Sequence, residues 1–212
     1  MITAIGDVMR ECYNRGWITT RDGNCSLRRK NDNKIYITPS GVRKNIIYPE
    51  TVEKIKVVNG DLQLRPELNP SGELEMHWLL LKNSQRTRCV LHVHPTHIVA
   101  AMYAGLSLSK IAADFPEIYR YTNVGPNVPV LPATSNELAN STFKNMTCSN
   151  GKIKYDVVGQ ADHGACSVGK NPWDAFEHIE RLDHICQIVL ASWIVTGKQH
   201  HTLFCRLNMS YF

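Results

Sequence analysis

The sequence lacks any apolar run long enough to cross a bilayer, because the longest candidate, residues 185–195, is interrupted by Gln187 and Ser192. Its first residues carry neither the basic region nor the apolar core of a secretory signal. It has no Cys-x-x-Cys pair, and its seven cysteines are dispersed. An odd, dispersed set without an export signal indicates reduced, mostly buried thiols. We therefore expect a cytoplasmic protein without a membrane partner.

Charge of one sign is not concentrated along the chain either. The 24 Lys and Arg and 19 Asp and Glu give a formal charge of +5, and the only basic triplet is Arg28-Arg29-Lys30. The asparagines that follow it indicate a solvated hairpin tip. Without a basic stripe or a recognition motif, we expect no nucleic-acid partner. The mild positive balance suits an anionic small-molecule substrate.

No repeat, linker or low-complexity segment divides the 212 residues, so we expect a single domain, residues 1–212. Helical periodicity is found in the segments 2–15, 73–83, 96–102, 135–144 and 172–189. Strand patterns are found in the segments 25–28, 34–38, 52–64, 89–94, 153–158 and 165–168. Because strands and helices interleave with many hairpin signals, the pattern predicts an α/β domain with a mainly antiparallel sheet. We also expect Thr96 to cap the helix that it begins.

The stretch His92-Val93-His94-Pro95 ends an apolar run that is typical of a buried strand. Alternate residues of a strand face the same side, so the two imidazoles can point at one object. Neutral imidazole is the commonest metal ligand, and catalytic zinc sites often use three protein ligands and an open position. His163 is the best third ligand, and Gly164 beside it would allow a tight turn. Cys89 and Cys166, each near a histidine, are weaker alternatives.

Two glycine-bearing loops and one helix start carry small polar groups. Asp22-Gly23-Asn24 and Thr38-Pro39-Ser40-Gly41 flank one hairpin, and Pro70-Ser71-Gly72 opens a helix. Hydroxyls, an amide and backbone N–H groups at such places can bind phosphate, although each loop alone is typical of an ordinary turn. Glu73 follows in the first helical turn, where a carboxylate suits the helix dipole.

Together these residues indicate one kind of chemistry. An acid beside a phosphate site and a metal held by three histidines is what enolate chemistry on a phosphorylated hydroxyketone requires. A metal polarises an oxygen and stabilises the enediolate. The carboxylate moves protons, and the loops fix the substrate through its remote phosphate.

The sequence resembles the class II aldolase/adducin family, which contains L-fuculose-1-phosphate aldolase, L-ribulose-5-phosphate 4-epimerase and related decarboxylases and dehydratases. Five motifs appear in the family's order and span about Met1 to Gly197, which leaves residues 198–212 as a C-terminal tail. The motifs are Gly23-Asn24-Cys25-Ser26-Leu27-Arg28, Ile37-Thr38-Pro39-Ser40-Gly41, Pro70-Ser71-Gly72-Glu73-Leu74-Glu75-Met76-His77, His92-Val93-His94-Pro95 and His163-Gly164-Ala165-Cys166-Ser167-Val168-Gly169.

The resemblance implies a three-layer α/β/α sandwich around a mainly antiparallel central sheet. It implies that His92, His94 and His163 bind Zn²⁺ or another divalent metal such as Mn²⁺ or Co²⁺. It implies that Glu73 is the acid/base residue, whereas Glu75 does not match the family position. Family members form homotetramers with active sites at subunit interfaces, which is the assembly expected here.

By the same resemblance, five residues hold the phosphate of the sugar substrate: Asn24, Ser40, Gly41, Ser71 and Gly72. Tail tyrosines assist catalysis in the aldolases, and Tyr211 is the catalytic candidate here. The tyrosine that a neighbouring subunit supplies has no clear counterpart, since Tyr119 and Tyr121 lie outside a clean match. His77 and His97 lie close enough to the motifs to contact a ligand residue, although ordinary structural roles are favoured.

The resemblance is greatest to the fuculose-phosphate-type aldolases, which favours cleavage of a phosphorylated ketose to dihydroxyacetone phosphate and an aldehyde. The alternatives are a decarboxylase of a phosphorylated oxo-acid and a sugar-phosphate 4-epimerase. Glu73 favours carbon–carbon cleavage, because the epimerases typically have an aspartate there. A non-catalytic, adducin-like interaction module is the alternative of another class, and the intact set of histidines with Glu73 argues against it.

Overall fold

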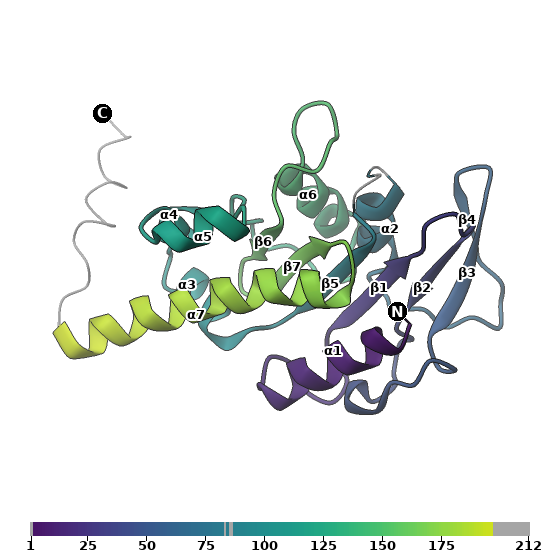
Figure 1. Cartoon of the computed structure of the whole chain (residues 1–212), viewed down its shortest axis with the longest axis horizontal. Coiled ribbons are helices and arrows are strands. Elements are labelled where there is room, and N and C mark those ends of the chain that lie inside the picture. Colours follow the sequence, from purple (N-terminus) through teal and green to yellow (C-terminus); the bar gives the residue numbers. More distant parts are fainter. Residues whose placement is uncertain (1, 83, 85–86, 197–212) are drawn as a thin grey trace.

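One antiparallel sheet forms the centre of the computed structural model, which describes residues 2–82, 84 and 87–196 (Figure 1). Within these residues the sheet has seven strands in the order β4-β3-β2-β1-β5-β7-β6, and all neighbouring strands are antiparallel. The strands are β1 (Asn24–Arg28), β2 (Lys34–Ile37), β3 (Glu53–Val58), β4 (Asp61–Gln63), β5 (Cys89–Val93), β6 (Val157–Gln160) and β7 (Gly164–Gly169).

Helices cover both faces of this sheet. Figure 1 shows α1 and α7 across one face and α2 and α6 on the other, and two separate hydrophobic clusters match these two interfaces. The helices are α1 (Thr3–Asn14), α2 (Leu74–Lys82), α3 (Thr96–Tyr103), α4 (Leu108–Ala113), α5 (Pro116–Tyr121), α6 (Asn136–Met146) and α7 (Pro172–Thr196), with a short 3-10 turn, η1 (Lys44–Ile46). The three-layer α/β/α sandwich predicted from the sequence is confirmed.

Side-chain alternation along β5 determines which face carries the candidate site. Leu91 and Val93 belong to the cluster beneath α1, α3 and α7. Val90 belongs to the cluster beneath α2 and α6. His92 therefore points to the α2 side of the sheet. Because β5 lies between β1 and β7, Asn24 and Cys166 are the cross-strand neighbours of His92.

Several element boundaries differ from the sequence prediction. The predicted strand 153–158 begins only at Val157, and α4 and α5 are additional short helices. Thr96 does not cap α3: Pro95 is the N-cap residue and makes no side-chain cap. The carboxylate of Asp183 on α7 accepts the N–H groups of His97 and Ile98 instead. A partner 86 residues away in the sequence thus replaces the local cap.

The described cysteines are free thiols, and all of them except the exposed Cys148 are buried. Burial raises the pKa of the Cys12 and Cys89 thiols well above the ordinary value. Among the described helices, none combines the length and the apolar character that spanning a membrane requires. Tyr211 and the rest of the tail lie outside the described residues, so the catalytic role predicted for Tyr211 stays a prediction.

Candidate metal centre

Three histidine side chains converge at the end of β5. His92 belongs to β5, His94 follows it directly, and His163 lies in the turn between β6 and β7. Their candidate ligand atoms all lie within 4.8 Å of one another, and the Nε2 atoms of His92 and His94 are 3.1 Å apart. The structure thus brings together the three histidines that the sequence predicts as metal ligands.

Hydrogen bonding and burial keep this cluster in a form that can bind a metal. His92 is 1% exposed, and its Nδ1 donates to the backbone carbonyl of Ala165 at 3.1 Å. Because a carbonyl only accepts, the ring proton is on Nδ1 and the Nε2 lone pair is free. Burial, with smaller contributions from His94 and His163, lowers the pKa of His92 well below its usual value. Burial, followed by His163, also lowers the pKa of His94.

The turn that presents His163 is tight for a different reason from the one predicted. Asp162 adopts the left-handed conformation, with φ of 56°, and reverses the chain. Gly164 is needed for space: a Cβ there would lie 2.5 Å from the Val93 carbonyl oxygen and 2.7 Å from Cδ2 of His94. The glycine lets β7 lie directly against the ligand strand.

The donor set fits a divalent ion. In the described part of the chain, His163 Nδ1 and Glu73 Oε1 are buried without a hydrogen-bond partner, which is costly unless a ligand compensates. Zinc with Zn–N bonds of about 2.0–2.1 Å places tetrahedral nitrogens roughly 3.3 Å apart, close to the 3.1 Å between His92 and His94. Cys166, although it neighbours His92 across the strands, is not part of the cluster.

Glu73 reaches the histidines from the residue just before α2. The carboxylate is 7% exposed, and its Oε2 lies 3.3 Å from His92 Nε2. The same oxygen accepts a hydrogen bond of 2.8 Å from Asn24 Nδ2. Ser71 caps this corner, because its Oγ accepts the Glu73 N–H at 3.3 Å. Glu75 is exposed, as expected for the less suitable of the two acids.

Two of the segments predicted to hold phosphate, residues 38–41 and 70–72, lie side by side and are called the paired loops below. Pro39 and Pro70 form an antiparallel bridge. The N–H of Ser71 bonds to the Thr38 carbonyl at 3.1 Å, and the N–H of Ser40 bonds to Asn69 at 2.9 Å. These two N–H groups join the loops to each other, so neither of them is available to a ligand.

Two cations beside these loops were not identified from the sequence. Lys44 is 2% exposed, and its Nζ donates to the carbonyls of Pro39 and Val42 at 3.2 and 3.1 Å. Burial lowers its pKa, which the Asp22 carboxylate partly opposes. Arg21 donates to the Gly41 carbonyl at 2.9 Å.

One hollow of about 160 Å³ connects these groups. Its walls include the three histidines, Glu73, both cations and four of the five residues predicted to hold phosphate. The fifth, Gly72, lines a small adjoining hollow with Glu73 and Thr134. Among the residues that the structure describes, no tyrosine lines the larger of the two.

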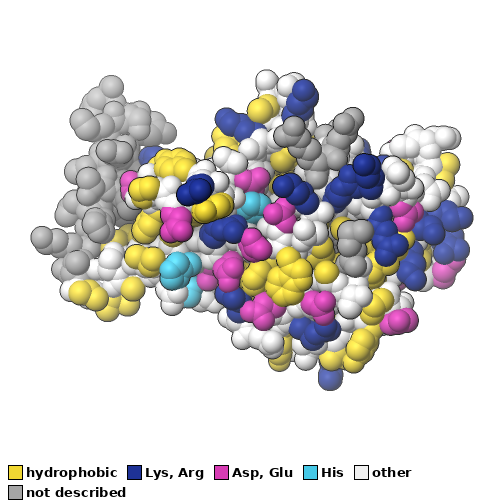
Figure 2. Space-filling model, viewed as in Figure 1, with side chains coloured by type: hydrophobic (Ala, Val, Ile, Leu, Met, Phe, Trp, Pro, Cys, Tyr) yellow, Lys and Arg dark blue, Asp and Glu magenta, His cyan; other side chains and the backbone are white. Residues whose placement is uncertain are grey.

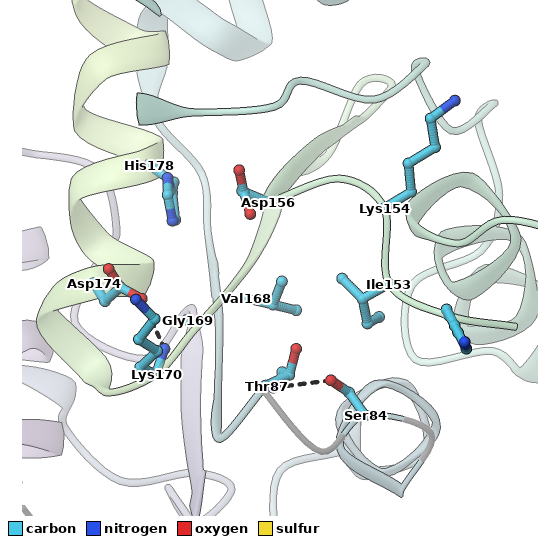
Figure 3. Close-up of a pocket in the computed structure, with 11 residues that line it drawn as sticks. Ser84, Thr87, Ile153, Lys154, Asp156, Val168, Gly169, Lys170, Asp174 and His178 are labelled. Carbon is cyan, nitrogen blue, oxygen red and sulfur yellow. Dashed lines mark hydrogen bonds between the residues drawn. The ribbon is translucent and has the colours of Figure 1, made fainter. Parts of the chain in front are cut away.

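Larger hollows lie at the opposite ends of β5 and β7. One of about 820 Å³ has Ile153 and Val168 on its floor, with His178 and Asp174 of α7 on one wall (Figure 3). A neighbouring hollow of about 760 Å³ shares Ser84 and Thr87 with it. Its cations are Arg28, Arg29, Lys30, Lys82 and Arg88. Lys and Arg side chains gather toward the right of Figure 2, on the side of β1 to β4. The fold thus brings Lys82 and Arg88 to the basic triplet Arg28-Arg29-Lys30.

Comparison with known structures supports the fold. The L-fuculose-1-phosphate aldolase from Thermus thermophilus matches with a TM-score of 0.76 and 23% identity, over 92% of this chain and 94% of that one. A sugar-phosphate aldolase from Thermotoga maritima matches with a TM-score of 0.75 and 21% identity, over 93% and 96% of the two chains. At these identities the likeness concerns the fold.

Comparison with known sequences identifies the family. A probable methylthioribulose-1-phosphate dehydratase of Drosophila grimshawi is 35% identical over 94 residues, which are 43% of this chain and 40% of that protein. The matched region thus spans about two-fifths of this curated relative. The model of the class II aldolase and adducin N-terminal domain matches residues 3–190. Because this match covers most of the chain and the five motifs lie within it, the protein belongs to the class II aldolase and adducin family.

Proposed function

We propose that this protein is a metal-dependent lyase that acts on a phosphorylated ketose through an enediolate. The observation that carries the proposal is the position of Glu73. One of its oxygens lies 3.3 Å from a histidine of the candidate metal centre, and the other, Oε1, is buried with no partner among the described residues. A buried carboxylate oxygen without a partner at such a centre is suited to accept and return a proton.

The protein's own residues have separate roles in this reaction. A divalent ion held by His92, His94 and His163 would supply Lewis-acid stabilisation of the negative charge that develops on the substrate oxygens. Glu73 moves the proton at the carbon next to the carbonyl group. The serines and glycines of the paired loops, with Lys44 and Arg21 beside them, hold the phosphate and fix that carbon against Glu73.

Two reactions use this arrangement. In dehydration, Glu73 removes a proton next to the carbonyl group, and the hydroxyl on the following carbon leaves with a proton as water. In aldol cleavage, the hydroxyl on that following carbon loses its proton and becomes the carbonyl group of the leaving aldehyde as the bond between the two carbons breaks, and Glu73 protonates the remaining enediolate carbon. We favour dehydration, because two Drosophila relatives above 30% identity are named as probable methylthioribulose-1-phosphate dehydratases. Aldol cleavage, predicted from the motifs, is second and agrees with the aldolases that share the fold.

The test begins with the metal content of the purified protein. The metal-loaded protein is then incubated with methylthioribulose 1-phosphate and, separately, with a panel of ketose 1-phosphates. Loss of water without release of dihydroxyacetone phosphate supports dehydration, and release of dihydroxyacetone phosphate with an aldehyde supports aldol cleavage. No turnover of any substrate by fully loaded protein would overturn the lyase proposal and favour an interaction module. The Glu73→Gln variant is the background control in both assays.

A further inference from the structure

A chain of buried polar side chains lies behind Glu73, between β1 and α2. Glu73 Oε2 accepts from Asn24 Nδ2 at 2.8 Å, and Asn24 Oδ1 lies 2.5 Å from His77 Nε2. The other ring nitrogen of His77 lies 2.6 Å from Ser26 Oγ. His77 and Ser26 are fully buried, and Asn24 is 6% exposed. Four residues are thus linked by three hydrogen bonds away from bulk water.

Secondary structure explains why these four side chains meet. Asn24 and Ser26 are two residues apart on a strand, so they face the same side, toward α2. Glu73, just before α2, and His77, in its first turn, are four residues apart and joined by a backbone hydrogen bond, so they lie on the same side of the helix. The two side chains of each pair are similarly spaced, roughly 5–6 Å apart along the helix and roughly 6–7 Å apart along the strand. Each strand residue therefore has a helix residue opposite it.

The direction of all three hydrogen bonds follows from the carboxylate of Glu73. A carboxylate accepts, so the Asn24 amide turns its NH₂ group to Glu73 and its oxygen to His77. That oxygen also only accepts, so the proton of the His77 ring is on Nε2. Nδ1 then accepts the hydroxyl proton of Ser26. Burial lowers the pKa of His77 to about 3, so the ring is neutral at pH 7 and carries this single proton.

We propose that His77 is a positioning residue for Glu73: it fixes the Asn24 amide, which holds Oε2 and leaves Oε1 as the reactive oxygen. A reversed amide would place its oxygen against the carboxylate, and His77 prevents this by occupying that oxygen. The motif comparison assigns Asn24 to the phosphate. Both polar atoms of its side chain, however, already form hydrogen bonds to Glu73 and His77. In this proposal its contribution is to Glu73. The kinetic consequence rests on the proposed function.

Two substitutions separate the role of the Nε2 proton from the role of the ring volume. In His77→Gln the amide NH₂ reaches the position of Nε2 and still donates to Asn24. In His77→Asn the amide reaches only the position of Nδ1, so the bond to Asn24 is lost. We expect His77→Asn to lower kcat by roughly 10–100-fold, the usual effect of losing such a supporting bond. We expect His77→Gln to keep kcat within a few-fold of wild type, with KM and metal content unchanged in both.

The matched control is His178→Gln, which changes another buried histidine that bonds to Thr122 rather than to the site. We expect its kcat to equal that of wild type. The proposal is overturned if Gln and Asn at position 77 lower kcat equally, or if the loss in His77→Asn arises from lost metal or raised KM. Circular dichroism and oligomer size identify variants that fail to fold.

A second measurement needs neither substrate nor a variant. In protein labelled with ¹⁵N-histidine, correlations between the ring carbon-bound protons and nitrogens distinguish a protonated from an unprotonated Nε2. We expect His77 to be neutral at pH 7 with its proton on Nε2. A proton on Nδ1, or on both nitrogens, would overturn the hydrogen-bond direction whatever reaction the protein catalyses. Failure of the proposed function appears instead as absent turnover with the His77 tautomer as expected.

Discussion

The carboxylate of Asp183 accepts a hydrogen bond from the indole N–H of Trp17 at 3.2 Å. The same carboxylate accepts the N–H groups of His97 and Ile98 in the first turn of α3. The backbone carbonyl of Trp17 in turn accepts the N–H of His94 at 2.9 Å. Asp183 therefore connects α7 and the segment after α1 to the point where the chain leaves β5, the strand of the candidate metal centre.

Replacing Asp183 should lower stability, because Asp183→Ala leaves several donors without their acceptor. We expect the free energy of unfolding to fall by about 1–3 kcal/mol, measured by urea denaturation at pH 7. Glu177→Ala is the control on the same helix, since its ion pair with Arg181 is partly exposed and should change stability by less than about 0.5–1 kcal/mol. Equal effects of the two substitutions would show that Asp183 has no special role.

His94→Ala should remove the metal without unfolding the protein. His94 lies just beyond β5 and is only partly buried, so its loss removes a ligand and leaves the sheet intact. We expect metal content well below one ion per chain after dialysis, with an unchanged circular dichroism spectrum. His97→Ala is the control, because His97 Nδ1 lies 3.0 Å from Asp183 rather than at the metal centre. Retention of stoichiometric metal by His94→Ala would contradict the ligand assignment.

Glu73→Gln should separate proton transfer from metal binding. The amide keeps the shape of the carboxylate but is a poor proton acceptor, so we expect metal content to be unchanged and kcat to fall by roughly 10²–10⁴-fold. The exposed Glu75 provides the control, since Glu75→Gln should leave kcat unchanged. Steady-state kinetics on metal-loaded proteins measures both. A Glu73→Gln enzyme with wild-type kcat would remove Glu73 from the proposed mechanism.

The stability of the metal-free protein should decrease as the pH falls below about 6.5, the ordinary pKa of histidine. His77 has a pKa of about 3 in the folded protein, so between these values the unfolded state binds a proton that the folded state does not. For such a histidine, the free energy of unfolding falls by up to about 1.4 kcal/mol for each pH unit. Urea denaturation should therefore show that the free energy of unfolding falls less between pH 7 and pH 5 for His77→Gln than for wild type. Equal differences would indicate that His77 does not contribute.

Gly164→Ala should weaken metal binding by crowding the ligand strand. The added Cβ would overlap the Val93 carbonyl oxygen and the His94 ring, so β5 and β7 must move apart at a cost of about 1–3 kcal/mol. Competition with a chelator measures the affinity. Gly105→Ala is the comparison, because its Cβ would meet open space and only its φ of +78° is unfavourable. We expect Gly105→Ala to lower stability and to leave metal affinity unchanged.

The parts of the site that sequence predicted are those with local causes. The alternation of His92 and His94 and the order of the five motifs place most of the hollow's residues. Residues whose roles depend on distant partners were missed. Asp183 replaces Thr96 as the cap because α7 packs against α3, and the N–H of Lys44 bonds to the Thr20 carbonyl, 24 residues away. The hollow of about 760 Å³ that is lined by Lys and Arg side chains was missed. It forms because strand pairing places Arg28 against the backbone of Arg88.

The strand order β1-β5-β7 has a consequence for how the protein folds. Asn24, His92 and Cys166 are neighbours across these strands, although they lie far apart in the chain. No short segment therefore contains the site, and pairings of such long range form late because closing large loops is entropically slow. We expect the ion to bind after the central strands have assembled, so that it slows unfolding more than it accelerates folding.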